Sequence, residues 1–343
     1  MGETTFLILG GYGNTGMPVA RLLLRETDAH VVLAGRSIEK AETAARDLNE
    51  QFPGDRVTAR RADAADTASL AAAFEGVDFV LVASSTSQYA GQVARAALDA
   101  GIDYLDIHYY GKKNEQLHSL AGEIESAGRC FITEAGFHPG LPSALVRWAA
   151  ARCDGSIESA EVAALFNMEG DIPLTESLYE LVETFKDYQA LEFRDGAWRK
   201  CGWSGYRKID FGPEFGSRWC VPMFFEEMRA LPSMLPTLRR AGFVIAGWNW
   251  FTDWIVSPIM MLALKLWPRR AVRPMAKLLH WSLKFARPPY GVLLKVTASA
   301  PEGESWRDVE ALLYHPDGYE FTAIPVVACL LQYLDGSARK PGL

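Results

Sequence analysis

The sequence predicts an α/β protein with a doubly wound parallel sheet, followed by a second domain of the α+β class. The first 136 residues alternate short apolar runs with helical patterns, which is the order of a parallel sheet with crossover helices. A glycine-rich turn, GGYGNTG at residues 10–16, joins the first apolar run to the first helical pattern. Farther along, residues 198–222 are dense in glycine, aromatic and charged side chains, which is typical of antiparallel strands and loops.

Six strands are predicted in the first part of the chain, each a short apolar run bounded by turn residues. They cover residues 5–9, 30–34, 56–63, 77–85, 103–107 and 130–136. The helical patterns between them cover a stretch directly after the glycine-rich turn and then residues 37–49, 67–74, 89–100 and 115–127. This alternation predicts one parallel sheet with helices on both faces.

The second part of the chain contains a predicted β-hairpin and a closing helix. Residues 290–300 alternate as a strand does, and residues 309–315 resemble its hairpin partner. We therefore expect a first domain at residues 1–140 and a second domain at residues 141–320. The last helical pattern lies within residues 321–343, and we expect this helix to pack back on the first domain.

Gly11, Gly13 and Gly16 form a G-x-G-x-x-G pattern between a predicted strand and a predicted helix. That context is what the dinucleotide-binding fingerprint of a Rossmann domain requires. The first glycine allows the tight turn, the second lets backbone N–H groups approach a pyrophosphate, and the third lets the helix pack closely on the sheet. The positive end of the helix then faces the phosphates. The alternative is a glycine-rich turn without a ligand.

Three further residues of this turn are candidates for the same cofactor site. Gly10 adds a fourth bare position, and Asn14 and Thr15 add side-chain donors at the start of the helix. For Asn14 and Thr15 the alternative is ordinary capping of the helix.

The end of the second predicted strand decides which dinucleotide we expect. An NAD site places Asp or Glu about 20 residues after the glycines, where it holds the ribose 2′-hydroxyl. This chain has Arg36 and Ser37 there, with Lys40 one helical turn later. A carboxylate would repel a 2′-phosphate, whereas guanidinium, hydroxyl and ammonium groups bind it. The sequence therefore predicts NADP(H) as the cofactor.

Further cofactor contacts are expected where other strands end, because ligands of a doubly wound sheet lie beyond the carboxyl ends of its strands. Asp63 and Ala64 end the third predicted strand and should border the adenine. Ser84 and Ser85 end the fourth and should lie near the nicotinamide-side ribose. The alternative is that these are ordinary turn residues at strand ends.

Three side chains are candidates for the proton that accompanies hydride transfer. His108 and Tyr109 follow the fifth predicted strand, and His138 follows the sixth. Histidine and tyrosine side chains can both supply a proton at neutral pH. A single histidine near a strand end can instead be a hydrogen-bonded structural residue, and the sequence leaves that alternative open.

Composition and charge argue against several classes of protein. The net charge of −7 argues against general nucleic-acid binding. The five cysteines are scattered without C-x-x-C spacing, which favours free thiols in a reducing, cytoplasmic compartment. The six histidines show no paired zinc-site spacing, so we expect no metal. We expect no secretion signal either, because the apolar run at residues 5–9 is too short.

Taken together, the motifs resemble those of the saccharopine dehydrogenase-like NADP-binding oxidoreductases over nearly the whole chain. The matching stretches are GGYGNTG, AGRS, AALDAGIDYLD, EAGFHPGLPS and the terminal YEFTAIPVVACLLQYLDG followed by KPGL. The resemblance implies a two-domain dehydrogenase whose second domain carries a mixed sheet and forms a homodimer, with a small-molecule substrate between the domains. In that family hydride moves between a nicotinamide and a carbon–nitrogen bond of an amino-acid conjugate, and relatives of similar architecture reduce carbon–carbon double bonds.

An aromatic and apolar insertion at residues 242–288, which we expect to be helical, departs from the amino-acid enzymes of that family and argues against a small, doubly charged substrate. Residues 242–267 are long enough to cross a bilayer, but Asp253 within that stretch makes a spanning helix costly, and we expect none. The following helical pattern, residues 274–288, places basic side chains on one face, and these are Arg273, Lys277, His280, Lys284 and Arg287.

This basic helix allows two interpretations. Residues 265–287 contain no acidic residue, and Trp281 lies at the border of the basic face, which suits peripheral contact with an anionic membrane. The alternative is a helix at a dimer interface or over the substrate pocket, with a solvated basic edge.

The sequence as a whole predicts an NADPH-dependent reductase of a C=N or activated C=C bond in a partly hydrophobic small molecule. A membrane-peripheral lipid or enoyl reductase is the second interpretation. A non-catalytic NADP-sensing protein is the third, because no acid–base pair stands out among the residues.

Overall fold

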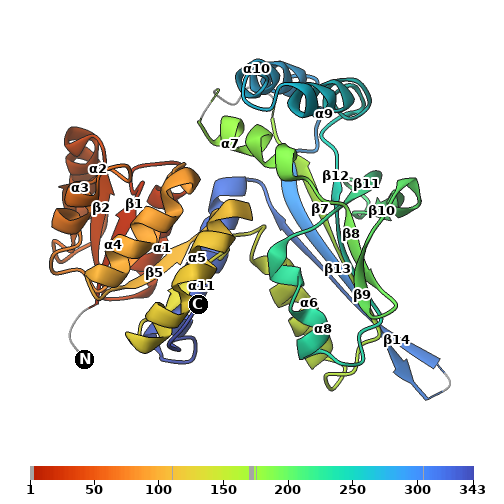
Figure 1. Cartoon of the computed structure of the whole chain (residues 1–343), viewed down its shortest axis with the longest axis horizontal. Helices are drawn as coiled ribbons and strands as arrows, with labels where there is room; N and C mark the ends of the chain where they lie inside the picture. The colour runs from red at the N-terminus through yellow and green to blue at the C-terminus, as the bar shows by residue number, and fades with distance from the viewer. Residues whose placement is uncertain (1–3, 110, 170–173, 175, 304) are drawn as a thin grey trace. The chain divides into compact units, whose positions relative to one another are not determined.

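The computed structural model describes residues 4–343 except 110, 170–173, 175 and 304. The chain divides into two units (Figure 1). Unit 1 comprises residues 1–140 together with 319–343, and unit 2 comprises residues 141–318.

Unit 1 is built on one parallel sheet, which confirms the predicted doubly wound architecture. Its strands follow the order β3-β2-β1-β4-β5-β6. The order reverses at β1, whose neighbours are β2 and β4, and this is the switch point at which doubly wound sheets bind nucleotides. The strands are β1 (Thr5–Leu9), β2 (His30–Gly35), β3 (Val57–Arg61), β4 (Phe79–Val82), β5 (Asp103–Asp106) and β6 (Phe131–Ile132).

The sixth strand is much shorter than the predicted residues 130–136. The chain leaves the ladder after Ile132, and Glu134 has a left-handed φ of 59°. A left-handed residue cannot continue an extended strand, so residues 133–135 are irregular backbone, and Gly136 forms only an isolated bridge with Gly140.

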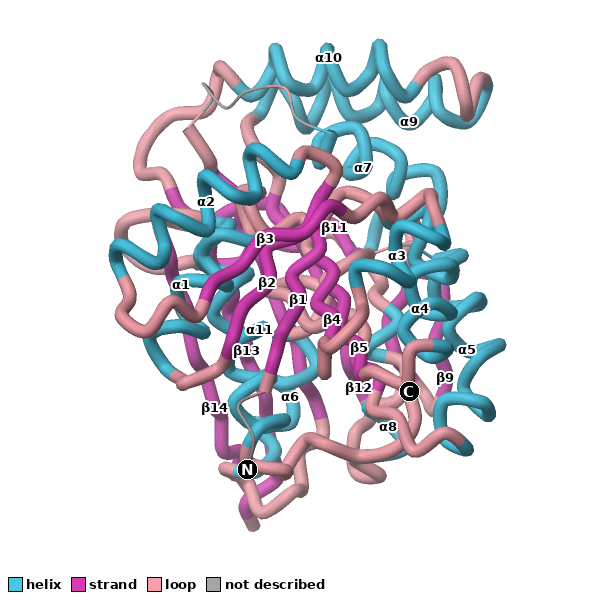
Figure 2. Tube along the Cα trace, turned by 90° about the vertical axis from the view of Figure 1, so that its left-hand side faces the viewer, coloured by secondary structure: helices cyan, strands magenta, loops and turns pink. Residues whose placement is uncertain are grey.

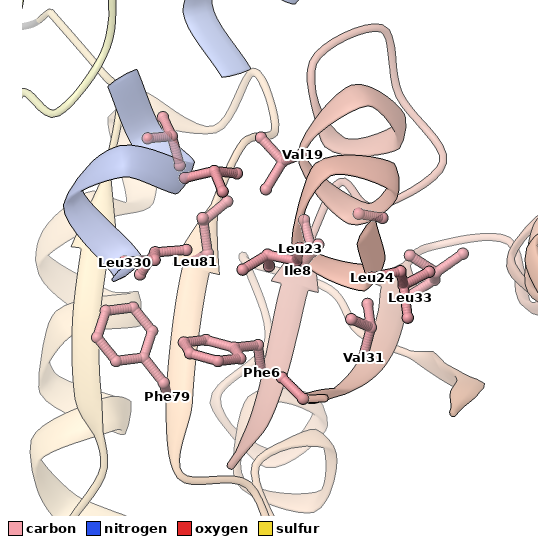
Figure 3. Close-up of a cluster of buried hydrophobic side chains, with 14 of the residues drawn as sticks. Phe6, Ile8, Val19, Leu23, Leu24, Val31, Leu33, Phe79, Leu81 and Leu330 are labelled. Atoms are coloured by element: carbon pink, nitrogen blue, oxygen red, sulfur yellow. The ribbon is translucent and has the colours of Figure 1, made fainter. Parts of the chain in front are cut away.

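Helices cover both faces of this sheet and bury two apolar clusters. One cluster includes Phe6, Ile8, Val19, Leu23 and Leu330, which point toward one another in Figure 3. The other cluster lies between the opposite face of the sheet and α3 to α5. The helices are α1 (Gly16–Glu26), α2 (Ile38–Gln51), α3 (Thr67–Ala73), α4 (Ala90–Asp99) and α5 (Gly111–Ser126), with a 3-10 turn η1 (Ser87–Tyr89) before α4.

The C-terminal helix α11 (Gly318–Leu334) belongs to the core of unit 1. Tyr333 packs edge-on against Phe79, with ring centroids 4.7 Å apart, and its hydroxyl donates to Asp103 at 2.7 Å. Beyond the helix, Gly342 exchanges backbone hydrogen bonds with the β6 edge. The end of the chain is thus tied to the sheet.

Unit 2 is built on a mixed sheet with the order β10-β11-β12-β7-β13-β14, to which β8 and β9 attach beside β12. Only the β12–β7 pair is parallel, and the other pairs are antiparallel. The long β13–β14 hairpin contains the predicted residues 290–300 and 309–315. The strands are β7 (Ser159–Asn167), β8 (Leu191–Arg194), β9 (Ala197–Lys200), β10 (Arg207–Asp210), β11 (Ser217–Met223), β12 (Arg240–Ala246), β13 (Gly291–Glu302) and β14 (Ser305–His315).

The apolar insertion at residues 242–288 is not helical throughout, because it begins inside strand β12. A fully buried parallel strand has a continuous apolar run that periodicity cannot distinguish from a buried helix. The rest is helical, and α9 and α10 lie side by side at one end of unit 2 (Figures 1 and 2). The helices of unit 2 are α6 (Leu141–Ala151), α7 (Glu176–Thr184), α8 (Leu231–Met234), the π-helical turn η5 (Thr252–Val256), α9 (Ser257–Leu266) and α10 (Val272–Leu283), with 3-10 turns η2 (Phe185–Asp187), η3 (Trp203–Gly205) and η4 (Glu226–Met228).

Among the described residues, none of these helices combines the length and the hydropathy that a bilayer-spanning segment requires.

Candidate active site

The fingerprint loop is held tightly by the rest of unit 1. A Cβ added to Gly10, whose φ is +87°, would lie 2.8 Å from Ser84, and one added to Gly11 would lie 2.8 Å from Leu33. A Cβ on Gly16 would collide with the carbonyl oxygen of Gly10. These three glycines are therefore required by close packing of the loop between β1, β4 and α1.

Gly13 differs from the other glycines of the loop. Its φ is not positive, and an added Cβ would meet only the Gly10 carbonyl oxygen, at 3.0 Å. The backbone angle therefore does not require glycine at this position, although a Cβ would press on that carbonyl oxygen. The demand that remains is the one the fingerprint predicts, which is room for a ligand beside the backbone.

The start of α1 offers free backbone donors. The N–H groups of Asn14, Thr15 and Gly16 donate to no acceptor in the described part of the chain. Thr15 occupies the capping position but makes no side-chain cap, so the capping alternative does not account for it. Several free N–H groups at a helix start suit the oxygens of a pyrophosphate, and the loop therefore fits a dinucleotide.

Tyr12 joins the fingerprint loop to the end of β2, a role that the sequence did not reveal. Its hydroxyl accepts the backbone N–H of Ser37 at 3.1 Å. A Cβ on Gly35 would lie 2.5 Å from that hydroxyl oxygen, so the tyrosine ring packs over bare backbone. The loop and the predicted 2′-phosphate residues are thereby held at a fixed spacing.

The predicted 2′-phosphate residues lie together after β2, but Ser37 has local partners. Arg36 and Lys40 are exposed. The Ser37 hydroxyl accepts the Lys40 backbone N–H at 3.3 Å, which caps α2, and donates to the Glu39 carboxylate at 2.8 Å. Backbone and Ser37 hydrogen bonds hold the pKa of Glu39 below its usual range. An anionic side chain thus stands where the phosphate is expected.

A second arginine, which the sequence analysis overlooked, ends the neighbouring strand. Arg61 is exposed and is the register partner of Gly35 across the β2–β3 ladder. Arg60 faces elsewhere and donates to the carbonyl oxygens of Ala73 and Glu75. Of these two adjacent arginines, Arg61 is therefore the additional cation beside the position predicted for the 2′-phosphate.

The two predicted adenine neighbours are turn and core residues in the structure. The Asp63 carboxylate accepts the backbone N–H of Ala65 at 3.0 Å, as in an Asx turn. The Ala64 side chain is buried in the cluster beneath. Any contact of these two residues with adenine would therefore involve backbone or the outer carboxylate oxygen.

Ser84 connects the fingerprint loop to His108. The Nε2–H of His108 donates to the Ser84 carbonyl oxygen at 2.6 Å, and Ser84 also packs against Gly10. The Ser84 hydroxyl exchanges a hydrogen bond with Thr86 at 2.7 Å, while Ser85 is partly buried beside it. The carboxyl ends of β1, β4 and β5 thus meet at one place.

His108 has one ring nitrogen in use and one left over. A carbonyl oxygen only accepts, so Nε2 carries a hydrogen, and Nδ1 is a bare acceptor whenever the ring is neutral. Nδ1 is buried and has no hydrogen-bond partner among the described residues. The backbone N–H of His108 donates to Asp106 at 3.0 Å, which fixes the residue at the strand end.

A buried ion pair supports the His108 segment from below. Lys113 donates to the Asp106 carboxylate at 2.8 Å, to the His108 carbonyl oxygen at 2.5 Å and to the Thr133 hydroxyl at 2.7 Å. These bonds use all three ammonium hydrogens. Asp106 also accepts the hydroxyls of Tyr104 and Thr133, each at 2.9 Å. The network joins β5, α5 and the segment after β6.

The ionisation of this network follows from burial and charge together. Burial alone would raise the pKa of Asp106, but Lys113 and the neighbouring donors outweigh it and lower the pKa below the usual range. Burial beside this carboxylate raises the pKa of Tyr104 well above its usual value. Asp106 is therefore anionic at neutral pH, and Tyr104 remains a neutral donor.

The other two predicted proton donors are Tyr109 and His138. Tyr109 is partly buried, and the adjacent residue 110 lies outside the described residues. The His138 ring stacks on Phe137 at 4.4 Å between centroids. Burial lowers the pKa of His138 to about 4, so its imidazole is neutral at pH 7.

Unit 2 contains two open hollows of about 540 and 570 Å³, which share Lys186 and Tyr188 in their linings. Neither is lined by a residue that the sequence predicted for the site. The residues that the sequence predicts for the site lie instead in unit 1, near the ends of its strands. Among the described residues there is no group of His, Cys, Asp or Glu side chains that could hold a metal ion.

The comparison with protein families decides the nature of unit 1. Residues 6–132 match the saccharopine dehydrogenase NADP binding domain. Unit 1 therefore contains an NADP-binding domain of the saccharopine dehydrogenase type. The predicted resemblance and the predicted NADP(H) cofactor are thereby confirmed.

The chain is also similar to one known protein in sequence and to two solved structures in fold. It is 24% identical over 277 residues to carboxyaminopropylagmatine dehydrogenase of Synechocystis, covering 75% of this chain and 65% of that protein. The match thus spans less than two thirds of the relative. The structure of saccharopine dehydrogenase (L-Glu forming) from Saccharomyces cerevisiae is similar with a TM-score of 0.70 at 16% identity, over 99% of this chain and 93% of that one. A putative myo-inositol dehydrogenase from Sinorhizobium meliloti has a TM-score of 0.50 at 10% identity, over 97% and 89%.

Proposed function

We propose that the protein is an NADPH-dependent reductase that transfers hydride to a C=N or activated C=C bond of a partly hydrophobic small molecule. The observation that carries the proposal is the Ser84–His108 hydrogen bond of 2.6 Å directly beside Gly10 of the fingerprint loop. Dinucleotides bind beyond the strand ends of such sheets. A side chain that can carry a proton therefore stands next to the proposed cofactor site.

Each predicted cofactor residue has a proposed role. The N–H groups of Asn14, Thr15 and Gly16 bind the pyrophosphate. The 2′-phosphate is bound by Arg36 and Lys40, together with Arg61 and, once Glu39 turns away, the Ser37 hydroxyl. Gly10, Gly11 and Gly13 let the backbone approach the cofactor, Asp63 and Ala64 border the adenine, and Ser84 and Ser85 border the nicotinamide-side ribose.

The proton requires a separate donor. Bound NADPH supplies the hydride, and the reduced atom pair must also take up one proton. We propose that His108 gives this proton from Nδ1 when the ring is doubly protonated, since the Ser84 carbonyl holds the Nε2–H. Tyr109 is the second candidate donor. His138, neutral at pH 7, is better suited to a hydrogen bond with the substrate than to proton donation.

The substrate class rests on two supports of different kinds. The names of the relatives, carboxyaminopropylagmatine dehydrogenase and saccharopine dehydrogenase, favour a carbon–nitrogen bond. The aromatic and apolar residues of 242–288 favour a substrate with a hydrophobic part. We therefore place an imine of a partly apolar amine ahead of an enoyl compound.

Two further proposals concern assembly and location. We propose a homodimer in the cytoplasm, supported by the family resemblance and by cysteines that are all free. A second candidate function is a membrane-peripheral lipid or enoyl reductase, which the exposed tryptophans beside α9 and on α10 favour. Sedimentation equilibrium of the purified protein tests the dimer.

The reaction is tested with NADPH deuterated at the transferred position. Imines formed from amines and keto acids are compared with α,β-unsaturated acyl compounds, and deuterium in the product is measured by mass spectrometry. His108→Gln should lower turnover about 100-fold or more while leaving NADPH affinity unchanged. A panel without any deuterium transfer, or full turnover by His108→Gln, would contradict the proposal.

A further inference from the structure

Large apolar side chains are exposed along α9, α10 and the residues beside them. Their exposed fractions range from 41 to 71%. Monomeric soluble proteins rarely expose so many neighbouring apolar side chains without a partner. The α9–α10 surface, as we define it, consists of Trp250, Trp254, Ile255, Ile259, Leu262, Leu266, Trp267, Trp281 and Phe285.

The exposure follows from how the helices pack on unit 2. Met260 and Leu264 of α9 and Leu279 of α10 are buried in one apolar cluster, together with Leu178 and Val182 of α7. Each helix thus packs one face against that cluster and exposes its other face. In both views of the chain α9 and α10 lie side by side as the outer layer over α7 (Figures 1 and 2).

Aromatic contacts join the two ends of this surface. The Phe251 ring lies 5.7 Å from Trp281 and 5.3 Å from Phe285, centroid to centroid. Trp250, the most exposed of the group at 71%, lies 5.9 Å from Phe251. The beginning of the π-helical turn and the end of α10 therefore share one aromatic cluster, and the surface is continuous.

The charge of this surface is opposite to that of the whole protein. The net charge of the chain is −7, yet residues 254–301 contain no Asp or Glu. Among the described residues, no ion pair involves a lysine or arginine of this segment other than Lys295. Seven of them accompany the exposed apolar residues, namely Lys265, Arg269, Arg270, Arg273, Lys277, Lys284 and Arg287.

The positive charge and the apolar character of the surface distinguish between two occupants, a second copy of this chain and a lipid bilayer. A second copy of this chain would meet the same patch in a two-fold dimer, which would oppose seven cations with seven cations. An anionic bilayer suits both the cations and the exposed apolar side chains. Its headgroups attract the cations, and its acyl boundary accepts tryptophan, leucine and isoleucine side chains. Each cation near such a surface strengthens binding about fivefold.

We infer that the α9–α10 surface docks the protein on an anionic lipid bilayer, with the exposed apolar side chains at the acyl boundary and the cations among the headgroups. The inference deepens the second candidate function and names its surface. It does not depend on the reaction, because the residues that carry it lie outside the nucleotide-binding unit.

Vesicle flotation tests the inference with the full chain. The probes are vesicles of phosphatidylcholine alone and of phosphatidylcholine with phosphatidylglycerol. The protein should float only with the second kind. Ile259→Ser/Leu266→Ser and Arg269→Gln/Arg270→Gln should each weaken binding about tenfold or more. The matched control, Trp306→Ser/Leu312→Ser, removes similarly exposed apolar side chains from β14 (58 and 45% exposed) and should leave binding unchanged.

NADPH affinity and thermal melting, measured for every variant, show that the variants fold. Absence of flotation with anionic vesicles by the unmodified protein would overturn the inference. So would an equal loss of binding in the Trp306→Ser/Leu312→Ser control. Dimers that Ile259→Ser/Leu266→Ser dissociates, without any vesicle binding, would assign the surface to a second copy instead. Vesicle binding by a protein that fails every turnover assay would sustain the inference and count only against the proposed reaction.

Discussion

The Lys113 ammonium group lies 2.8 Å from the Asp106 carboxylate, and neither side chain has any exposed surface. The same lysine holds the carbonyl oxygen of His108, so the pair anchors the segment that we propose to be catalytic. With all its hydrogens engaged, Lys113 is a positioning residue and not a proton donor.

Lys113→Met should destabilise the protein by about 3–5 kcal/mol, because it leaves Asp106 buried without its counter-ion. The pKa of Asp106, which Lys113 holds low, should then rise. A carboxyl with a raised pKa gives stability at low pH and loses it as the pH rises. The loss relative to the unmodified protein, measured by urea unfolding, should therefore be smaller at pH 5 than at pH 8.

The double variant Asp106→Leu/Lys113→Met is the control for this prediction. Removing both charges should recover much of the stability that the single change costs. A single variant as stable as the unmodified protein at pH 8 would contradict the account of the ion pair.

Arg36→Asp should weaken NADPH binding about ten- to a hundredfold, since one charge-assisted phosphate contact contributes about 1.5–3 kcal/mol. NADH binding should change little. Arg46→Asp is the matched control, because it changes the net charge by the same amount and lies on α2. It should leave the affinities for NADPH and NADH near their original values. Equal affinity of the unmodified protein for NADPH and NADH in fluorescence titration would refute the role of Arg36.

Glu39→Gln should have the opposite effect and strengthen NADPH binding severalfold. Its carboxylate lies 2.8 Å from the Ser37 hydroxyl, where it would repel a 2′-phosphate and occupy a donor. The glutamine removes the repulsion and keeps the side chain's size. Titration with NADPH checks the change, and unaltered or weaker binding would show that the phosphate lies elsewhere.

Asp253, in the π-helical turn η5 before α9, leads to a prediction about how the stability of the protein depends on pH. Burial raises its pKa to about 6, although backbone N–H groups at Trp248 and Asn249 oppose the shift. The pKa of Asp253 is thus higher in the folded protein than in the unfolded chain. This carboxyl therefore stabilises the folded protein below about pH 4, and that stability is lost as the pH rises through about 6.

Asp253→Asn should therefore stabilise the protein by about 1–3 kcal/mol at pH 8 and by little at pH 4.5. The asparagine oxygen can still accept the Trp248 N–H that Asp253 binds at 3.0 Å. Urea unfolding at the two pH values measures the difference. A variant that is less stable at pH 8 would show that the charge itself is needed there.

The sequence was sufficient for the parallel sheet, because each strand of unit 1 has its own apolar run between turn residues. It also located the fingerprint loop, where glycine spacing and flanking elements agree. Tyr12 escaped notice because its partner, Ser37, is 25 residues away. Strand β12 was mistaken for the start of a helical insertion, since a strand buried on both faces has no alternation to read.

The Asp106–Lys113 pair illustrates why the site could be predicted only in part. The Tyr104-x-Asp106 motif was visible in the sequence, but Lys113 lies in a polar helix where a lysine normally faces water. The pairing exists because β5, α5 and Thr133 converge in three dimensions. Local patterns do not encode such convergence, so the sequence indicates His108 as a candidate by its position but does not reveal the ion pair that supports it.

The most direct test of the account concerns Gly13, the glycine that the fingerprint places beside the pyrophosphate. NADPH affinity by fluorescence titration is measured for Gly13→Val, together with thermal melting of the same variant without ligand. We predict that NADPH binding is lost while the protein still folds with a modestly lowered melting temperature, because φ is not positive at Gly13 and an added Cβ makes one tight contact, with the Gly10 carbonyl oxygen. A Gly13→Val protein that binds NADPH as tightly as the unmodified protein would contradict the proposed cofactor site.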